Sequence, residues 1–291
     1  MDLPTGAVLL GASTLGQPDR PGADELAEAM LRSGFPAIDT ANGYAAGRSE
    51  AYLGAAIGRV GRPEGTAVVT KVDADPVTGV FDGDRVRRSF AESLDRLGLD
   101  RVPLLHLHDP YTVTLAEAMA PGGAVPALVR LREEGAVDAI GIAAGPVRLL
   151  LDYVETGAFD AVLTHNRFTL VDRSGGPVLR AARARGMLAI NAAPFGGGIL
   201  AGSTRHRDRY AYRPVSPEIL HRVGAARLAC SRHGVPMDAA ALAFSTRSPL
   251  VDATVVGISS AMRLRRLHEL VDTDVPDELL DELTALTDDD R

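Results

Sequence analysis

Eight short apolar segments, spread along the whole chain with helical patterns between them, limit the folds that this sequence can adopt. Most of them are unbroken apolar runs, which is typical of strands that are buried on both faces of a parallel sheet. The intervening segments place apolar residues at the spacing of amphipathic helices. The predicted strands are 7–10, 37–39, 67–71, 104–108, 139–142, 161–165, 188–192 and 254–257.

Strands that each lead into a helix predict a (β/α)8 barrel, the TIM barrel, as a single domain over residues 1–291. A doubly wound sheet is the alternative, but it would need the pattern Gly-x-Gly-x-x-Gly after the first strand, and residues 11–16 do not supply it. Glycines close behind several helical patterns are ordinary stop signals. The predicted helices are 24–32, 85–97, 124–132, 176–185, 217–230, 237–246 and 262–270.

The overall composition excludes several classes of protein. A net charge of −7 argues against nucleic acid or an anionic membrane as the main partner. The single cysteine, Cys230, excludes an internal disulfide framework. No apolar run approaches the length of a membrane span, and the N-terminus lacks the pattern of a signal peptide. We therefore expect a cytoplasmic protein that acts on a small molecule, as a monomer or a weak homo-oligomer.

One basic residue differs from all the others. Of 31 lysines and arginines, Lys71 is the only lysine. Lysine is a compact charge whose pKa shifts readily on burial, whereas arginine stays charged. Chance survival on the surface is the simple explanation, but Lys71 ends an apolar strand, which favours a function that arginine cannot perform.

Four ionisable side chains lie at the ends of consecutive predicted strands or directly after them. Asp39 ends the second strand, Tyr44 lies in the loop after it, Lys71 ends the third strand and His108 ends the fourth. Barrel enzymes place catalytic residues at the carboxyl ends of their strands. A buried ammonium group is costly without a carboxylate partner, so we expect Asp39 to pair with Lys71.

The chemistry of this set follows from that pairing. A cationic lysine favours a nearby phenolate, so Lys71 is expected to lower the pKa of Tyr44 from about 10 towards the working range. The tyrosine then serves as acid or base, with His108 hydrogen-bonded to the same substrate oxygen. These groups suit proton transfer at a carbinol or carbonyl oxygen while hydride moves at carbon. We expect His106 and His108 to point to opposite faces, with His108 at the rim.

Each of the four residues also has an ordinary structural explanation. Asp39 could form a turn at the end of its strand, Tyr44 could be a surface residue of a loop, and one of the two histidines could pack against helices. Their combination on adjacent strands makes these separate explanations less favourable. The four are therefore predicted together as the catalytic residues.

Two later loops are predicted to bind the phosphates of a cofactor. The loop after 188–192 is rich in glycine, whose backbone can approach a ligand closely and offer N–H donors. The loop after 254–257 leads into a helix with arginines, and such a helix N-terminus is an anion site. A flexible turn and a solvated face are the alternatives. The predicted contacts are Ala193, Pro194, Phe195, Gly196, Gly198, Leu200, Gly257, Ser259, Ser260, Arg263 and Arg266.

Several of these segments resemble the aldo-keto reductases. The sequences DTANGY at 39–44, TK at 70–71, HLHDP at 106–110 and VGISS at 256–260 carry the resemblance, which spans nearly the whole chain. It implies a (β/α)8 barrel with NADP(H) or NAD(H) extended across its C-terminal rim. It also implies that Tyr44 donates or accepts a proton, Lys71 lowers its pKa, Asp39 holds Lys71 and His108 orients the carbonyl group.

Longer segments, such as APFGGGILA at 193–201, look like the branch of that family that contains L-fucose dehydrogenase, D-threo-aldose 1-dehydrogenase and L-galactose dehydrogenase. This branch implies oxidation of the anomeric hydroxyl of a free sugar to a lactone. A reductase of a pathway-specific aldehyde or ketone, such as a pyridoxal-type substrate, is the alternative. A non-catalytic regulatory barrel that binds nucleotide is a third possibility, and a phosphate-utilising barrel such as an isomerase is a weaker one.

The chain departs from the common pattern of the family on the cofactor side. Many relatives hold the nicotinamide amide with an asparagine and a glutamine on the fifth and sixth strands. Here His165 or Asn166 would replace the glutamine, and the fifth strand ends in alanines. Arg263 matches a position that commonly contacts the phosphate on the adenosine. The choice between NAD and NADP stays open, with the arginines favouring NADP(H).

Overall fold

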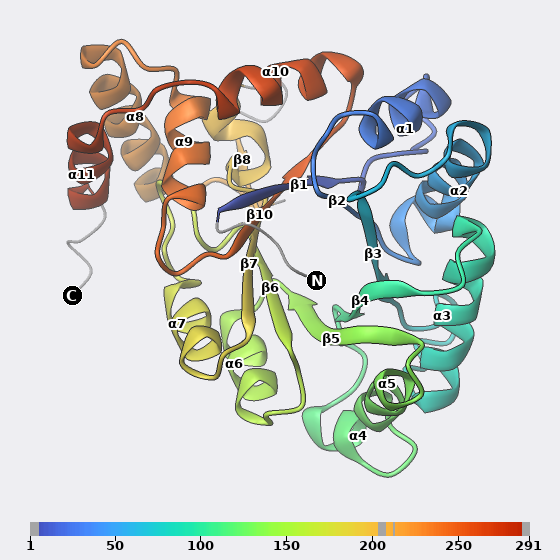
Figure 1. Ribbon diagram of the computed structural model, residues 1–291. Coiled ribbons are helices and arrows are strands. Elements are labelled where there is room, and N and C mark those ends of the chain that lie inside the picture. The colour runs from blue at the N-terminus through green and yellow to red at the C-terminus, as the bar shows by residue number, and fades with distance from the viewer. Residues whose placement is uncertain (1–5, 203–207, 212, 287–291) are drawn as a thin grey trace.

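The computed structural model describes residues 6–202, 208–211 and 213–286, and within them eight parallel strands close into a barrel (Figure 1). The last strand of the barrel lies between the first and the seventh, which closes the ring. The predicted fold is therefore confirmed. The barrel strands are β1 (Ala7–Gly11), β2 (Ala37–Asp39), β3 (Ala67–Val72), β4 (Val102–His108), β5 (Val137–Ala144), β6 (Ala161–His165), β7 (Leu188–Ala192) and β10 (Ala253–Gly257).

Helices surround this barrel on its outer side (Figure 1). They are α1 (Ala23–Leu31), α2 (Arg48–Val60), α3 (Gly83–Leu97), α4 (Leu115–Met119), α5 (Ala124–Glu133), α6 (Val147–Glu155), α7 (Gly176–Ala184), α8 (Pro217–Arg232), α9 (Met237–Thr246), α10 (Ala261–Val271) and α11 (Asp277–Ala285). Two 3-10 turns, η1 (Tyr44–Gly47) and η2 (Gly196–Ala201), and a short antiparallel pair, β8 (Arg209–Tyr210) with β9 (Arg213–Pro214), lie in the loops.

The unbroken apolar character of the strands reflects burial on both faces. Leu9, Val69 and Leu104 belong to a cluster inside the barrel, together with residues of the other strands. Their neighbours Leu10 and Leu105 belong to the two clusters between the strands and the helices. Because alternate residues face opposite sides of a strand, both sets must be apolar.

Strained backbone is concentrated at one end of the barrel. Ala45, Ala46, Asp109, Asn166 and Ala193 all have a positive φ, between 43° and 58°. Each lies in the loop that directly follows a barrel strand. Such a conformation costs about 1–3 kcal/mol for a residue other than glycine, and clusters of it mark functional sites. The strain therefore points to the C-terminal rim.

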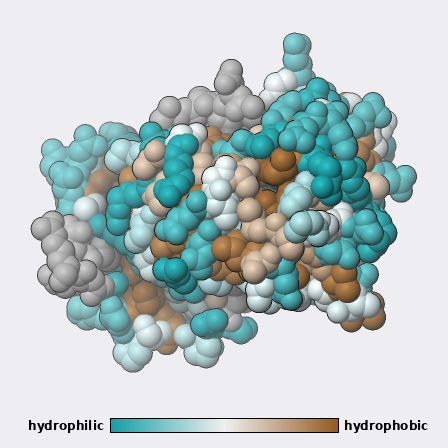
Figure 2. All heavy atoms as spheres, turned by 90° about the horizontal axis from the view of Figure 1, so that it is seen from below, coloured by the Kyte–Doolittle hydropathy of each residue, from teal (hydrophilic) through white to brown (hydrophobic). Residues whose placement is uncertain are grey.

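The outer surface is mainly polar. Figure 2, which looks at the molecule from below, shows hydrophilic residues over most of that face and apolar residues in patches between them. No helix in the described parts of the chain is long and apolar enough to cross a membrane.

Two glycines in α2 give a matched test of how closely the helices pack. A Cβ at Gly54 would lie 1.9 Å from the carbonyl oxygen of Arg96 in α3, whereas a Cβ at Gly58 would meet nothing within 4 Å. We expect Gly54→Ala to lower the free energy of unfolding by about 1–3 kcal/mol because of overpacking. Gly58→Ala should raise it by about 0.5–1 kcal/mol because alanine favours the helix. Urea denaturation measures both, and equal effects would contradict the packing described.

Candidate active site

The centre of the rim is a buried ion pair between two neighbouring strands. The Lys71 Nζ atom lies 2.6 Å from Asp39 Oδ1 and donates a second hydrogen bond to the Thr40 carbonyl oxygen at 2.7 Å. The two charged side chains are 1% and 5% exposed. Residues 37–39 of β2 pair in parallel with residues 67–69 of β3, which brings both side chains to the same end of the barrel. The predicted pairing of Asp39 with Lys71 is confirmed.

The partners of Lys71 keep its ammonium group charged. Burial alone lowers the pKa of Lys71, but the charges and hydrogen bonds of Asp39 and Tyr44 more than offset this, so that its pKa lies above the ordinary value. The only lysine of the chain is therefore a fixed positive charge inside the barrel rim.

Tyr44 lies directly against this charge. Lys71 Nζ is 4.7 Å from the centroid of the Tyr44 ring, which also meets the His108 ring edge-on at 5.4 Å between centroids. The residues after the tyrosine, Ala45 and Ala46, have the left-handed backbone conformation within η1. The loop after β2 thus turns sharply at the position that brings the phenol over the ends of β3 and β4.

The electrostatic environment of Tyr44 differs from the sequence prediction. Burial raises the pKa of Tyr44 to about 12, and Asp39 adds to the rise, while the charge and hydrogen bonding of Lys71 lower it. The expected influence of Lys71 is present, but the cost of burying a phenolate exceeds it. The hydroxyl group of Tyr44 is therefore a hydrogen-bond donor at neutral pH in the protein alone.

The prediction that His106 and His108 face opposite sides of β4 is wrong. Residues two positions apart on a strand share a face, and Leu104, at the same alternation, lies inside the barrel. His106 is fully buried beneath the rim, and a Cβ on the adjacent Gly141 would lie only 2.2 Å from its Nδ1 atom. Burial, with the charges of Lys71 and His108, holds the pKa of His106 well below 6.5. His108 is at the rim, as predicted.

A carboxylate that sequence reasoning missed completes this group. Asp73 Oδ1 lies 2.8 Å from His108 Nδ1, and Asp73 Oδ2 accepts a hydrogen bond from the Gly43 amide at 2.7 Å. Asp73 lies two residues after Lys71, just past the end of β3. Its position at the same alternation as the lysine was a signal that could have been used.

The end of β6 carries the two residues predicted to contact the nicotinamide. Asn166 Nδ2 donates to His165 Nδ1 at 3.2 Å, and Asn166 Oδ1 is buried with no partner among the described residues. The His165 ring packs directly against Gly145, so that a Cβ added at this glycine would lie 2.8 Å from His165 Cε1. The histidine at the end of β6 thus packs against the residue that directly follows β5.

The glycine-rich loop after β7 is more self-contained than predicted. The amides of Gly196 and Gly198 donate to the carbonyl oxygens of Ala193 and Phe195, both at 3.0 Å. These two predicted N–H donors are therefore used within the turn. Pro194 and Leu200 are buried, with Leu200 fully enclosed in the core. The backbone conformation of this loop favours glycine, since Gly196, Gly197 and Gly198 all have positive φ values.

The loop after β10 begins at Gly257, which is exposed, and runs through Ser259 into α10. The Ser260 hydroxyl accepts the Arg263 amide hydrogen, so this serine is the N-cap of α10. The guanidinium of Arg263 has no hydrogen bond or ion pair within the described residues. Arg266 differs, because it donates to Asp238 at 3.0 and 3.1 Å and to Glu269 at 2.9 Å. Two carboxylates already neutralise Arg266, so of the two predicted arginine contacts Arg263 is the one whose guanidinium has no partner among the described residues.

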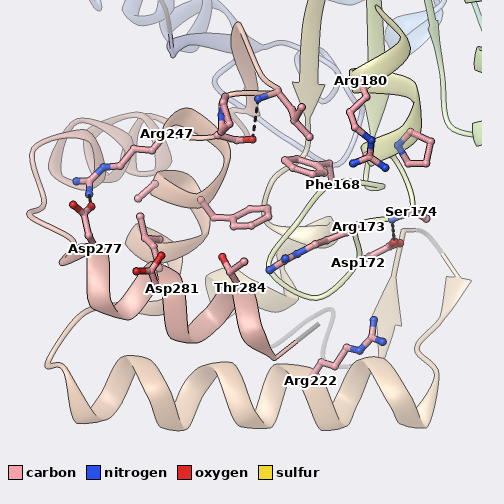
Figure 3. A pocket seen from close by; sticks show the side chains of 18 residues that line it. Phe168, Asp172, Arg173, Ser174, Arg180, Arg222, Arg247, Asp277, Asp281 and Thr284 are labelled. Atoms are coloured by element: carbon pink, nitrogen blue, oxygen red, sulfur yellow. Dashed lines mark hydrogen bonds and ion pairs between the residues drawn. The ribbon is translucent and has the colours of Figure 1, made fainter. Parts of the chain in front are cut away.

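A separate cavity of about 1030 Å³ lies outside the barrel wall, between α7, α9 and α11. Figure 3 shows that Arg173 extends across it towards α11, while Arg247 points to Asp277. The Arg173 guanidinium is 5.0 Å from the Phe244 ring centroid and donates to the Leu283 carbonyl oxygen. None of the four predicted catalytic residues lines this cavity, which therefore does not belong to the rim site.

Comparison with known proteins agrees with this geometry. The model of the aldo/keto reductase family matches residues 6–288. The chain belongs to the aldo/keto reductase family. It is an NAD(P)-dependent oxidoreductase that acts on a small molecule, and its (β/α)8 barrel is the fold of that family.

Several relatives are similar over nearly their whole length. D-threo-aldose 1-dehydrogenase from Pseudomonas sp is 34% identical, with 94% of this chain and 91% of the relative covered. L-galactose dehydrogenase from Arabidopsis thaliana is 30% identical, with 98% of this chain and 91% of the relative covered. Pyridoxal 4-dehydrogenase from Microbacterium luteolum is 29% identical, with 94% of this chain and 91% of the relative covered. The solved structure of an aldo-keto reductase from Bacillus halodurans has the same fold, with a TM-score of 0.78 at 19% identity, covering 96% of this chain and 91% of that one.

The buried pair gives a direct stability test of the site. Asp39→Asn leaves the Lys71 ammonium buried without its carboxylate, so we expect the free energy of unfolding to fall by about 3–5 kcal/mol. Glu134→Gln is the control, because the ion pair of Glu134 with Arg87 is exposed, with side chains 49% and 40% accessible. That change should cost less than about 1 kcal/mol. Denaturant titration measures both, and similar losses would show that the pair is not the buried anchor described.

Proposed function

We propose that this enzyme oxidises the anomeric C1 hydroxyl of an aldose to a lactone, with Tyr44, Lys71, Asp39 and His108 as its catalytic group. The observation that carries the proposal is the packing of Tyr44 between Lys71, at 4.7 Å from its ring, and the His108 ring. A phenol hydroxyl, an imidazole and a fixed cation here face one rim position. These are the groups needed to bind and deprotonate a substrate oxygen.

Each residue has a distinct task in this proposal. Tyr44 and His108 hydrogen-bond the reacting oxygen: on oxidation the proton of the substrate hydroxyl passes to the His108 imidazole, because Tyr44 is already protonated, and on reduction Tyr44 can donate its proton. The positive charge of Lys71 stabilises the negative charge that develops on the tyrosine and on the substrate oxygen, as an electrostatic group fixed before the reaction begins. Asp39 keeps Lys71 charged and in place. A bound nicotinamide supplies the hydride acceptor or donor for the substrate carbon.

The residues of the rim fit a nicotinamide cofactor. Asn166 Oδ1, buried and without a partner in the described structure, can accept a hydrogen bond from the carboxamide of the nicotinamide. An unpaired buried acceptor is costly, so a ligand donor at this atom is favoured. His165 lies beside it, and Gly257, Ser259 and Ser260 lie between the end of β10 and the start of α10. The guanidinium of Arg263, which has no partner among the described residues, favours NADP(H) over NAD(H), since it can pair with the additional phosphate of NADP.

The proposal of an aldose rests on relatives. Two of the similar proteins are sugar dehydrogenases by name, and a third acts on pyridoxal. Reduction or oxidation of a pathway-specific aldehyde such as a pyridoxal-type compound is therefore the second candidate. The expectations of a cytoplasmic location and of a monomer or weak homo-oligomer come from the sequence alone and stay predictions.

The test replaces the hydroxyl of Tyr44. We expect Tyr44→Phe to lower kcat for oxidation of the best aldose by roughly 100-fold to 10,000-fold, the range that positioned acid-base groups contribute. Binding of NADPH, followed by its fluorescence, should be unchanged. Tyr153→Phe is the control, because the Tyr153 hydroxyl is buried in α6 and makes no hydrogen bond in the described structure.

The measurement uses a panel of free aldoses and aldehydes with NAD and NADP, read at the nicotinamide absorbance. Turnover that survives in Tyr44→Phe would contradict the assignment of the catalytic group. Turnover of aldehydes alone would favour the second candidate.

A further inference from the structure

The Asp73 carboxylate is held rigidly from two directions. Its Oδ2 atom accepts the Gly43 amide hydrogen at 2.7 Å. The backbone of the same residue is fixed to α3, since its amide donates to the Ser89 hydroxyl at 3.1 Å and its carbonyl oxygen accepts from Arg85 Nε at 2.9 Å. Only Oδ1 remains for the ring of His108, at 2.8 Å from Nδ1. The geometry of this contact is therefore set by the fold and not by the histidine.

The contact determines where the neutral histidine carries its hydrogen. A carboxylate can only accept a hydrogen bond, so Nδ1 must be the donor. In a neutral imidazole the other nitrogen, Nε2, is then an acceptor. The nearest acidic atom to Nε2 is Asp109 Oδ2 at 3.8 Å, which is beyond hydrogen-bond distance. Within the described structure the Nε2 lone pair is thus available to a ligand.

The other charged groups around His108 do not oppose this arrangement. Asp109 is shared with His165, whose Nε2 lies 3.9 Å from Asp109 Oδ1. Because Asn166 donates to His165 Nδ1, the hydrogen of a neutral His165 is on Nε2, which faces that carboxylate. Tyr44 approaches His108 edge-on. Lys71 and His106, the latter held neutral by burial, lie on the barrel side. Among the described residues, Asp73 is the only hydrogen-bond partner of the His108 ring.

We propose that Asp73 is a positioning residue that makes neutral His108 accept a hydrogen bond from the substrate. The site then binds the hydroxyl form of its substrate, a hemiacetal or alcohol, in preference to the carbonyl form. A hydroxyl donates to His108 Nε2 and accepts from the Tyr44 hydroxyl, so both of its hydrogen-bonding roles are satisfied. A carbonyl oxygen can only accept hydrogen bonds, so its lone pairs would face the lone pair of Nε2 with no hydrogen between them. This inference rests on the proposed function, in which His108 touches the reacting oxygen.

The Asp73→Asn variant reverses the polarity of the histidine. The Gly43 amide is always a donor, so the oxygen of the new amide must face it and the NH2 group must face His108 Nδ1. Nδ1 then accepts, and the hydrogen of the neutral ring moves to Nε2. One substitution of nearly equal size thus converts an acceptor for a hydroxyl into a donor for a carbonyl.

The first measurement needs neither turnover nor cofactor. ¹⁵N NMR of protein labelled at histidine reports the tautomer of each ring, and the His108→Gln spectrum identifies the resonances of His108 among those of the seven histidines. At a pH where these resonances show a neutral ring, wild-type protein should carry the hydrogen on Nδ1 and Asp73→Asn on Nε2. Hydrogen on Nε2 in the wild type, or the same tautomer in both proteins, would overturn the proposal.

The second measurement asks whether the tautomer selects the ligand. An alditol is titrated onto the complex with reduced cofactor and an aldonolactone onto the complex with oxidised cofactor, since neither pair can react. In Asp73→Asn, affinity for the alditol relative to the lactone should fall roughly tenfold or more, as expected when one hydrogen bond is replaced by an unpaired group. An unchanged ratio, with the tautomer reversed, would overturn the proposed substrate preference and leave the tautomer assignment intact.

Two further variants separate position from charge. Asp75→Asn removes a carboxylate two residues along the same loop, where the Asp75 side chain accepts hydrogen bonds from Val77 and Thr78, and it should leave both readouts unchanged. Asp73→Ala removes the acceptor without supplying a donor, so it should weaken the preference for Nδ1 without reversing it. An effect of Asp75→Asn equal to that of Asp73→Asn would indicate general electrostatics and overturn the proposal. Failure of the proposed function would instead appear as absent turnover with the tautomers as described.

Discussion

The rim of the barrel depends on one interaction, the buried contact between the Lys71 ammonium and the Asp39 carboxylate at 2.6 Å. Neither charge could stay in this place alone, because an unpaired buried charge costs several kcal/mol. Together they join the ends of β2 and β3 and place a permanent positive charge under the Tyr44 ring. A chain that uses arginine for every other basic residue retains a lysine here. A compact ammonium group suits this site between a carboxylate, a carbonyl oxygen and a phenol.

Around this pair the loops hold their side chains through strain and mutual hydrogen bonds. The positive φ values after β2, β4, β6 and β7 all lie at the same rim. Asp73 links the loop after β3 to the loop of Tyr44 through Gly43, and to β4 through His108. The site is therefore assembled from backbone conformations that the barrel imposes, and the free energy needed to hold them comes from the apolar layers on either side of the strands.

The sequence predicted the barrel well because its strands are buried on both faces, which leaves unbroken apolar runs of the right length. It predicted the Asp39–Lys71 pair because burial of a charge requires a partner. It missed Asp73, although this residue lies at the same alternation as Lys71, because its contacts with Gly43 and His108 join segments that are far apart in the sequence. It also overestimated how far Lys71 lowers the pKa of Tyr44. The opposing effect of burial depends on the packing of several loops around the tyrosine and not on any one of them. The ion pairs of Arg266 with Asp238 and Glu269 were likewise not predicted, because Asp238 lies on a different helix from Arg266.

The central claim is that Lys71, kept charged by Asp39, opposes the effect of burial on Tyr44. The measurement is the ionisation of Tyr44 between pH 8 and 12, taken as the difference in absorbance at 295 nm between proteins with and without the Tyr44→Phe change. With Lys71 present, the pKa of Tyr44 should be about 12. In the Lys71→Met background the phenolate loses its nearest positive charge, so the fraction of Tyr44 ionised at pH 11 should fall and the midpoint should rise. An unchanged or lower midpoint in Lys71→Met would contradict the account.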